Sequence, residues 1–237
     1  MWPFRKKQTL KESGFFRGFT DWHCHILPDV DDGVQTMDEA LQILGEYERL
    51  GVKEVWLTPH IMEDMPNTTQ HLRARFVELQ SAYQGNIALN LASENMLDNL
   101  FEERLNKNDL LPIGKAGKHL LVETSYFNPP MDLQNILLRI KAKGYYPILA
   151  HPERYHYLST MQEYEELYHR GIQLQLDIAS IVGAYGEEAR SKALVLLQKG
   201  YYSLIGTDVH HKETFVKWIN IPVQKTVLKK MKYLIDK

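Results

Sequence analysis

The chain has 237 residues, of which 44% are apolar and 24% are charged, and its formal net charge is −2. This length suits a single α/β barrel domain, and the nearly balanced charge gives no basic field of the kind that attracts nucleic acid. Cys24 is the single cysteine, which excludes an intrachain disulfide, and no apolar run approaches the ~20 residues that span a bilayer. These features favour a cytoplasmic protein.

The first residues, Met1-Trp2-Pro3-Phe4-Arg5-Lys6-Lys7, place charge where a signal peptide needs its apolar stretch. Such an aromatic and basic tip can make at most a weak contact with an anionic membrane surface, and a frayed terminus is the commoner explanation. We predict an N-terminal extension over residues 1–17 and one domain over residues 18–237, because no low-complexity linker interrupts the latter.

Short apolar strands alternate with amphipathic helices along the chain. The predicted strands are 18–22, 52–58, 87–93, 119–123, 146–150, 172–178 and 201–206, and the predicted helices are 36–50, 68–83, 97–106, 131–143, 161–170, 186–199 and 223–235. Glycines 51, 144, 171 and 200 stand where a left-handed residue ends a helix. The alternation predicts parallel βαβ units, arranged either as a barrel or as an open doubly wound sheet.

Polar side chains follow six of the seven predicted strands. In a parallel barrel the carboxyl ends of the strands meet at one face, where active sites are built. Any one of these histidines or acids would more often be a structural residue, but together they predict a metal site. The candidate ligands are His23, His25, His60, Glu94, Glu123, His151, Asp208 and His210.

This ligand set exceeds the needs of one ion, so two or three divalent metals bridged by carboxylates are expected. Mixed imidazole and carboxylate ligands suit Mn²⁺, Fe²⁺, Zn²⁺ or Co²⁺ better than Ca²⁺. Arg154, three residues beyond His151, offers a planar fork for a phosphate, although a surface salt bridge is the competing explanation. Asp31-Asp32-Gly33 is either a simple turn or the source of an acid that orients a ligand.

The motifs resemble a known superfamily. His23-Cys24-His25-Ile26-Leu27-Pro28 before Asp31-Asp32-Gly33, and Ala150-His151-Pro152-Glu153-Arg154-Tyr155, resemble the polymerase and histidinol phosphatase (PHP) superfamily. More narrowly they resemble the bacterial protein-tyrosine phosphatases of capsule and exopolysaccharide operons. Thr58-Pro59-His60, Leu121-Val122-Glu123-Thr124-Ser125 and Thr207-Asp208-Val209-His210 follow in the same order.

The resemblance implies a distorted (β/α)7 barrel, similar to a TIM barrel, with a trinuclear centre that usually depends on manganese. It assigns metal ligation to the eight candidates above and phosphate binding to Arg154. We further expect catalytic roles for Arg154, Asp208 and His210. It also implies a phosphotyrosine substrate, often on a partner kinase that controls polysaccharide synthesis, hydrolysed by a metal-activated hydroxide.

Two departures from the family pattern stand out. Asp29-Val30 replaces the usual Gly-Ile, and no arginine follows His211 in the segment 212–217. Two other functions stay open on the same residues: a small-molecule phosphatase, such as one for histidinol phosphate, and a catalytically weak metal-binding partner of a kinase. Cys24 lies in no Cys-x5-Arg phosphate loop, so we do not expect a phosphocysteine.

Overall fold

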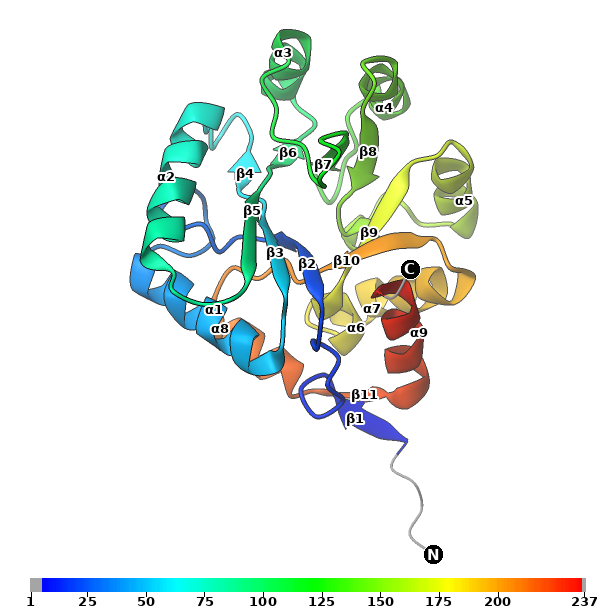
Figure 1. Cartoon of the computed structure of the whole chain (residues 1–237). Helices are drawn as coiled ribbons and strands as arrows, with labels where there is room; N and C mark the ends of the chain where they lie inside the picture. The colour runs from blue at the N-terminus through cyan, green and yellow to red at the C-terminus, as the bar shows by residue number, and fades with distance from the viewer. Residues whose placement is uncertain (1–5, 236–237) are drawn as a thin grey trace, which may run out of the picture.

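The predicted strands run parallel and are joined by helices in the computed structural model, which describes residues 6–235 (Figure 1). The strands are β1 Lys7–Thr9, β2 Thr20–Cys24, β3 Glu54–Leu57, β4 His60–Ile61, β5 Ala88–Leu91, β6 Glu94–Met96, β7 His119–Glu123, β8 Tyr146–Leu149, β9 Gln173–Asp177, β10 Tyr202–Gly206 and β11 Pro222–Gln224.

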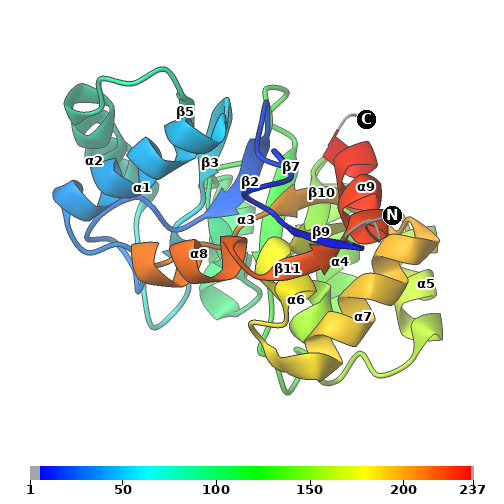
Figure 2. The same ribbon diagram turned by 90° about the horizontal axis from the view of Figure 1, so that it is seen from below.

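The helices cover the outside of the strands (Figures 1 and 2). They are α1 Met37–Leu50, α2 Thr69–Ala82, α3 Asn99–Lys107, α4 Leu133–Ala142, α5 Met161–His169, α6 Ile178–Val182, α7 Gly186–Lys199, α8 Lys212–Ile219 and α9 Lys225–Ile235, with a 3-10 turn, η1, at Pro152–Arg154. Glycines 51, 144, 171 and 200 all have positive φ and end helices, as predicted.

The strands form two parallel sheets, of order β2-β3-β5 and β10-β9-β8-β7-β6-β4, that curve into a barrel without formally closing. Predicted strand 52–58 breaks at Pro59 and continues as β4, and strand 87–93 breaks at Ser93 and continues as β6. After each break the strand pairs in the other sheet. The predicted distorted barrel is confirmed, and its distortion lies at these two breaks.

The first and last barrel strands meet at their carboxyl ends. The amides of Thr207 and Asp208 donate to the His23 carbonyl at 3.1 and 2.8 Å, and Cys24 forms a parallel bridge with Val209. The ring of strands is therefore joined at the end where the polar side chains gather.

The core has an inner and an outer part. Inside the barrel, Trp56, Ile113, Leu121 and Ile148 pack together, and Trp22 stacks on Trp56 with ring centroids 5.9 Å apart. Outside, the opposite faces of the strands pack against the apolar stripes of the helices. This sandwich holds the strand ends, and so the site, in fixed positions.

Four elements, besides the 3-10 turn, were not predicted from the sequence. Helix α6 overlaps the end of predicted strand 172–178. No element was predicted over 212–219, although Phe215, Trp218 and Ile219 form the buried face of α8. Strands β1 and β11 are three residues each and pair antiparallel, with Lys7 opposite Gln224. Elements this short leave little periodicity in a sequence.

Part of the predicted N-terminal extension packs onto the barrel. Leu10, Phe15 and Phe16 are buried, and Phe16 lies edge-on to Phe215. The division at residue 17 stays a prediction, and so does membrane contact by the tip, most of which lies outside the described residues. Within residues 6–235, no helix has the length and apolar character needed to cross a bilayer.

Candidate metal centre

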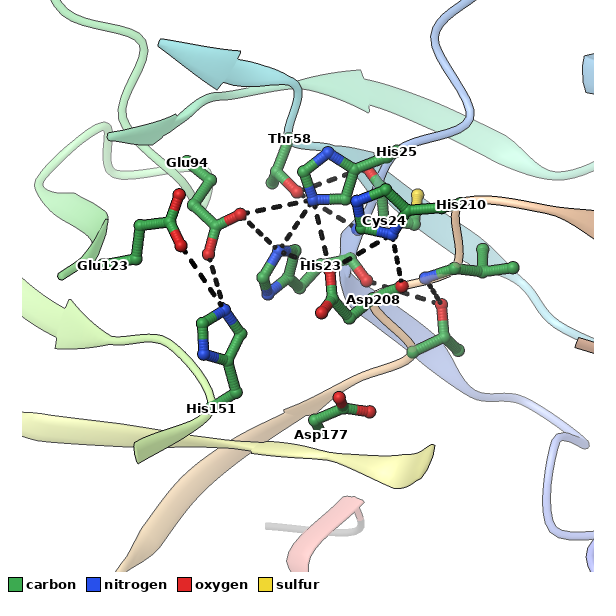
Figure 3. Close-up of polar contacts among 12 residues, drawn as sticks. His23, Cys24, His25, Thr58, Glu94, Glu123, His151, Asp177, Asp208 and His210 are labelled. Carbon is green, nitrogen blue, oxygen red and sulfur yellow. Dashed lines mark hydrogen bonds and ion pairs between the residues drawn. The ribbon is translucent and has the colours of Figure 1, made fainter. Parts of the chain in front are cut away.

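The eight predicted ligands lie together at the carboxyl-end face of the barrel. Figure 3 labels all of them except His60. Glu94 begins β6, and His151 and Asp208 are each the second residue after the ends of β8 and β10. Alternation along β2 directs His23 and His25 toward the cluster, while Cys24 turns into the hydrophobic core. Seven of these side chains are buried or nearly so, and His210 is the most exposed, at 25%.

A first group surrounds the tip of the β2 histidines. The Nε2 atoms of His23 and His25 lie 3.0 and 3.3 Å from Glu94 Oε2, and 3.3 and 3.2 Å from Asp208 Oδ1. The two Nε2 atoms are 3.1 Å apart. Two imidazoles and two carboxylates aimed at one point form a ligand set typical of a transition metal or zinc.

A second group shares Glu94. His60 Nδ1 lies 3.2 Å from Glu94 Oε2 and 3.0 Å from Glu123 Oε1, and His151 Nε2 lies 3.0 Å from Glu94 Oε1. Among the described residues His60 Nδ1, Glu123 Oε1 and Asp208 Oδ1 are buried without a hydrogen-bond partner. The close pair of His60 and Glu123 therefore lacks hydrogen-bond geometry. Buried nitrogen and oxygen atoms without a hydrogen-bond partner are costly, and a bound cation would supply the partner that these three atoms lack.

A third group includes Asp32, whose segment the sequence predicts to be either a turn or the source of an acid that orients a ligand. Asp32 Oδ1 lies 3.5 Å from His60 Nε2 and 3.7 Å from His210 Nε2, and His25 completes the group. His25, His60 and Glu94 each belong to two groups. Shared ligands of this kind fit two or three neighbouring ions better than one.

Outer hydrogen bonds fix the orientation of the imidazoles. Asp31 Oδ2 lies 2.8 Å from His25 Nδ1 and accepts the His60 amide at 3.0 Å, while Asp31 Oδ1 closes the turn by accepting the Gly33 amide. Gln175 Oε1 lies 3.0 Å from His23 Nδ1 and directs the opposite nitrogen, Nε2, into the centre. Asp31 therefore both closes the turn and contacts the imidazole of His25, a candidate ligand.

The backbone around the centre is strained and tightly packed. Among the described non-glycine residues, positive φ occurs at Asp29, Asn108, His151 and Asp208, two of which are predicted ligands. A Cβ on Gly33 would lie 2.4 Å from the His25 carbonyl oxygen, so the turn that brings Asp31 to His25 requires glycine. Asp29 has φ of 60°, a left-handed conformation that glycine adopts most readily.

Charges in the cluster compensate one another. Burial lowers the pKa of His23, but Glu94 and Asp208 outweigh this and raise it to about 9. Burial opposes ionisation of Glu94 and Asp208, yet the histidines hold both pKa values well below the usual range. Burial and the neighbouring His25 lower the pKa of His210 to about 4. The neutral form of His210 at pH 7 fits a metal ligand better than a proton donor.

Arg154 lies at the edge of this cluster. Its guanidinium binds Asp208 Oδ2, donates to the Tyr126 hydroxyl at 2.6 Å and lies 3.6 Å from Asp177 Oδ2. The rings of Tyr126 and Tyr185 lie 4.7 and 4.0 Å from its central carbon. Arg154 thus lies beside the ligand cluster and forms ion pairs with buried acids instead of the surface salt bridge considered from the sequence.

His71, His119, His156 and His169 belong to none of these groups. His211 is half exposed and lies 3.9 Å from Glu39. Asp177 caps α6 by accepting from the Ala179 amide and also faces Arg154. Cys24 is fully buried, and burial raises the pKa of its thiol, which disfavours the thiolate that a nucleophile requires.

The sequence analysis missed Gln175, Tyr126, Tyr185 and the ligand role open to Asp32. Gln175 had a detectable signal, because Gln173, Gln175 and Asp177 alternate with leucines in an otherwise apolar strand. Tyr126 and Tyr185 lie in loops, where no periodicity shows the direction of a side chain.

A parallel α/β barrel with a buried imidazole and carboxylate cluster at its strand ends defines a metal-dependent hydrolase. The chain belongs to the CpsB/CapC family of capsular polysaccharide synthesis, whose model matches residues 19–231. This agrees with the resemblance found in the sequence motifs.

Two similar proteins are named as tyrosine-protein phosphatases. Tyrosine-protein phosphatase YwqE from Bacillus subtilis is 26% identical over 201 residues, covering 82% of this chain and 78% of that protein. Tyrosine-protein phosphatase CpsB from Streptococcus pneumoniae is 28% identical over 210 residues, covering 82% and 84%.

Solved structures support the fold. One reported for YwqE from Bacillus subtilis and CpsB from Streptococcus pneumoniae, described as metal-dependent tyrosine phosphatases, matches with a TM-score of 0.77 at 22% identity. It covers 92% of this chain and 86% of that one. A lactonase, Lmo2620 from Listeria monocytogenes, matches with a TM-score of 0.52 at 14% identity, covering 92% and 86%. These likenesses concern the barrel alone.

Proposed function

We propose that this chain is a metal-dependent protein-tyrosine phosphatase. The observation that carries the proposal is the set of three overlapping ligand groups beside the fork of Arg154. Family membership and the names of the relatives agree with it. Two or three divalent metals, with manganese as the expected species, would be held by His23, His25, His60, Glu94, Glu123, His151, Asp208 and His210.

Metals at these ligands would activate water and neutralise charge on the transferred phosphoryl group. The protein's own part is orientation. Arg154 is fixed by Tyr126 and Tyr185, so its remaining N–H groups can be directed at phosphate oxygens at little entropic cost. Asp208 holds Arg154 beside the ligands, which places the phosphate contact next to the metal site.

A hollow of about 330 Å³ adjoins Arg154, with Tyr126, Phe127, His156 and Tyr185 in its wall. Phe127 is 69% exposed and stacks on His156 at 5.0 Å. Aromatic walls beside a phosphate-binding arginine favour an aryl phosphate on a peptide. A phenolate with a pKa of ~10 also leaves more readily than the alkoxide of serine.

The test is a substrate panel after chelation, with Mn²⁺, Fe²⁺, Zn²⁺ or Co²⁺ added back. We expect turnover only with metal, and phosphotyrosine peptide cleaved well ahead of phosphoserine peptide and histidinol phosphate. Full activity in protein shown to be metal-free by elemental analysis would disprove the metal dependence. A large preference for histidinol phosphate would assign the site to small molecules, the alternative that the same residues leave open.

The role of Arg154 has its own test. Arg154→Ala should keep the metal content and lower kcat/KM strongly, and Arg154→Lys should restore only part of it, because lysine lacks the planar fork. Loss of metal in Arg154→Ala would instead show that the residue supports Asp208. We further propose that the natural substrate is a cytoplasmic tyrosine kinase of polysaccharide export, which copurification of a phosphorylated kinase with an inactive Asp208→Asn variant would test.

A further inference from the structure

The loop between β7 and α4 exposes apolar side chains beside the metal centre. It covers residues 124–132 and begins directly after Glu123, a candidate ligand. Met131 is fully exposed and Phe127 is 69% exposed, the two highest values for large apolar side chains within residues 6–235. Large apolar side chains that lie close together in water usually mark a contact surface. We call residues 125–131 the apolar loop.

A second hollow, of about 440 Å³, lies between the apolar loop and the helices α4 and α5, which are neighbours in Figure 1. We call it the α4–α5 hollow. Much of its wall is apolar or aromatic, from Pro130, Met131, Leu133, Tyr157, Leu158 and Leu167. Leu158 and Leu167 are themselves buried. The volume is sufficient for one or two apolar side chains of a partner.

The apolar loop connects the α4–α5 hollow to the hollow beside Arg154. Phe127 lines the hollow of Arg154, and Pro129, two positions further along the chain, lines the α4–α5 hollow. The Cα atoms of these two residues are at most about 7.6 Å apart, since consecutive Cα atoms are 3.8 Å apart. An extended peptide advances about 3.3 Å per residue, so a chain that leaves the first hollow reaches the second within a few residues.

Hydrogen bonds hold the apolar loop in place against the segment that follows η1. The hydroxyls of Thr124 and Tyr157 lie 2.7 Å apart, and the His156 amide donates to the Tyr126 carbonyl at 2.8 Å. The ring of Tyr157 also stacks on that of Tyr155, with centroids 5.3 Å apart. A surface that is ordered in this way before binding loses little conformational entropy when a partner docks.

We propose that the apolar loop and the α4–α5 hollow bind the substrate polypeptide on one side of its phosphotyrosine, and that an apolar side chain a few residues away enters the hollow. This inference rests on the proposed phosphatase function and adds a sequence preference to its substrate. The surface leads away from Arg154, so only a substrate longer than its phosphorylated residue can use it. A peptide with leucine near the phosphotyrosine has the required chemistry.

The test compares two phosphotyrosine peptides as substrates of the metal-loaded full chain. The apolar peptide has leucine at the third and fourth positions on both sides of the phosphotyrosine, and the reference peptide has serine at the same positions. We expect kcat/KM to be at least about tenfold higher for the apolar peptide, because a leucine side chain leaves water in the hollow. The gain should appear mainly as a lower KM, since this burial is equal in the ground state and the transition state.

Two variants of exposed residues test the hollow itself. Met131→Asp places a charge at the rim, and Gln134→Trp fills part of the hollow with an indole ring. Both should lower the ratio of the two kcat/KM values toward one, because either change makes burial of leucine less favourable. The matched control is Val77→Asp in α2, where an exposed apolar residue that lines neither hollow receives the same charge. This control should keep the ratio of the unaltered protein.

Equal kcat/KM for the two peptides would overturn this proposal and leave the phosphatase function in place. An equal fall of the ratio in Val77→Asp and Met131→Asp would also overturn it, since the cause would then be net charge. Hydrolysis of p-nitrophenyl phosphate without hydrolysis of either peptide would overturn the proposed function, and this inference with it. Self-association that Met131→Asp abolishes, together with equal rates on the two peptides, would assign the surface to a second copy of the chain.

Discussion

The two ends of the same barrel are built on opposite principles. At the beginnings of the strands, Trp22, Trp56 and Ile148 form an apolar plug with stacked indole rings. At the carboxyl ends, histidines and acids crowd within hydrogen-bond distance, and two of them have strained backbones. The apolar end requires only volume and shape, whereas the polar end requires orientation, charge balance and a ligand.

The difference teaches where stability and function reside. Changes in the hydrophobic packing at the apolar end should lower the free energy of unfolding but leave the chemistry unaffected. At the polar end, small displacements of the ligand side chains should change the site even where the fold persists. The predictions below test this division, from the largest expected effect to the smallest.

Removing the shared carboxylate should have the largest effect. Glu94 reaches His23, His25, His60 and His151, so Glu94→Ala should lose metal and at least about 100-fold in kcat/KM, since changes beyond the direct ligands alone cost 10–100-fold. Elemental analysis and phosphatase assays measure both. The control at the other end, Trp22→Phe, should keep both values. Normal metal content in Glu94→Ala would contradict the assignment.

The second largest effect is expected from adding one methyl group at the polar end. Gly33→Ala places a Cβ against the His25 backbone and should lower metal affinity and activity by about 10–100-fold, because His25 or Asp31 must move. Gly45→Ala in α1, where no atom lies within 4 Å of the new Cβ, should raise stability slightly and leave activity unchanged. Metal titration and thermal unfolding distinguish the two. Similar behaviour of both variants would refute the close-packing argument.

Truncation at the apolar end should separate stability from chemistry. Trp56→Ala should lower the free energy of unfolding by about 3–5 kcal/mol, because a buried indole is removed from a closed core. Activity per folded molecule should stay near that of the unaltered protein. Urea unfolding and kinetics on the native fraction provide the measurement. A loss of activity as large as that of Glu94→Ala would erase the difference between the two ends.

The metal-free protein should lose stability at alkaline pH. The pKa of His23 is about 9 in the fold against an ordinary value of 6.5, so its ion pairs contribute fully below pH 6.5 and vanish as the pH rises through 9. The melting temperature should fall over this range, with a smaller fall in His23→Asn. The exposed His71→Asn is the control. Metal ligation already requires a neutral imidazole, so the metal-bound protein should show a smaller fall in melting temperature over this pH range. A steeper fall with bound metal than without it would contradict the role given to the His23 ion pairs.

The smallest effect is expected at the entrance loop. Asp29 already has φ of 60°, so Asp29→Gly should change the free energy of unfolding by no more than about 1 kcal/mol and leave activity intact. Asp29→Val should be clearly less stable, since a branched side chain disfavours this conformation. Equal stability of the two variants would show that the loop relaxes away from positive φ.

The sequence was sufficient to predict the strands and the cluster because both depend on local order. Strands rich in branched residues alternate with helices, and ligands such as His60 and Glu123 stand directly at strand ends. Gln175 and Tyr126 were missed because their roles depend on partners distant in the chain. The breaks at Pro59 and Ser93 were missed for a different reason, since a transfer between sheets leaves no signal in residue periodicity.

The bonds that join the first and last barrel strands also matter for biosynthesis. His23 and His25 leave the ribosome early, while Asp208 and His210 are among the last barrel residues made. The nascent chain therefore carries an open edge on β2 and an incomplete ligand set until β10 arrives. A chain that ends before β10 therefore lacks both the bonds that join the first and last barrel strands and the complete ligand set.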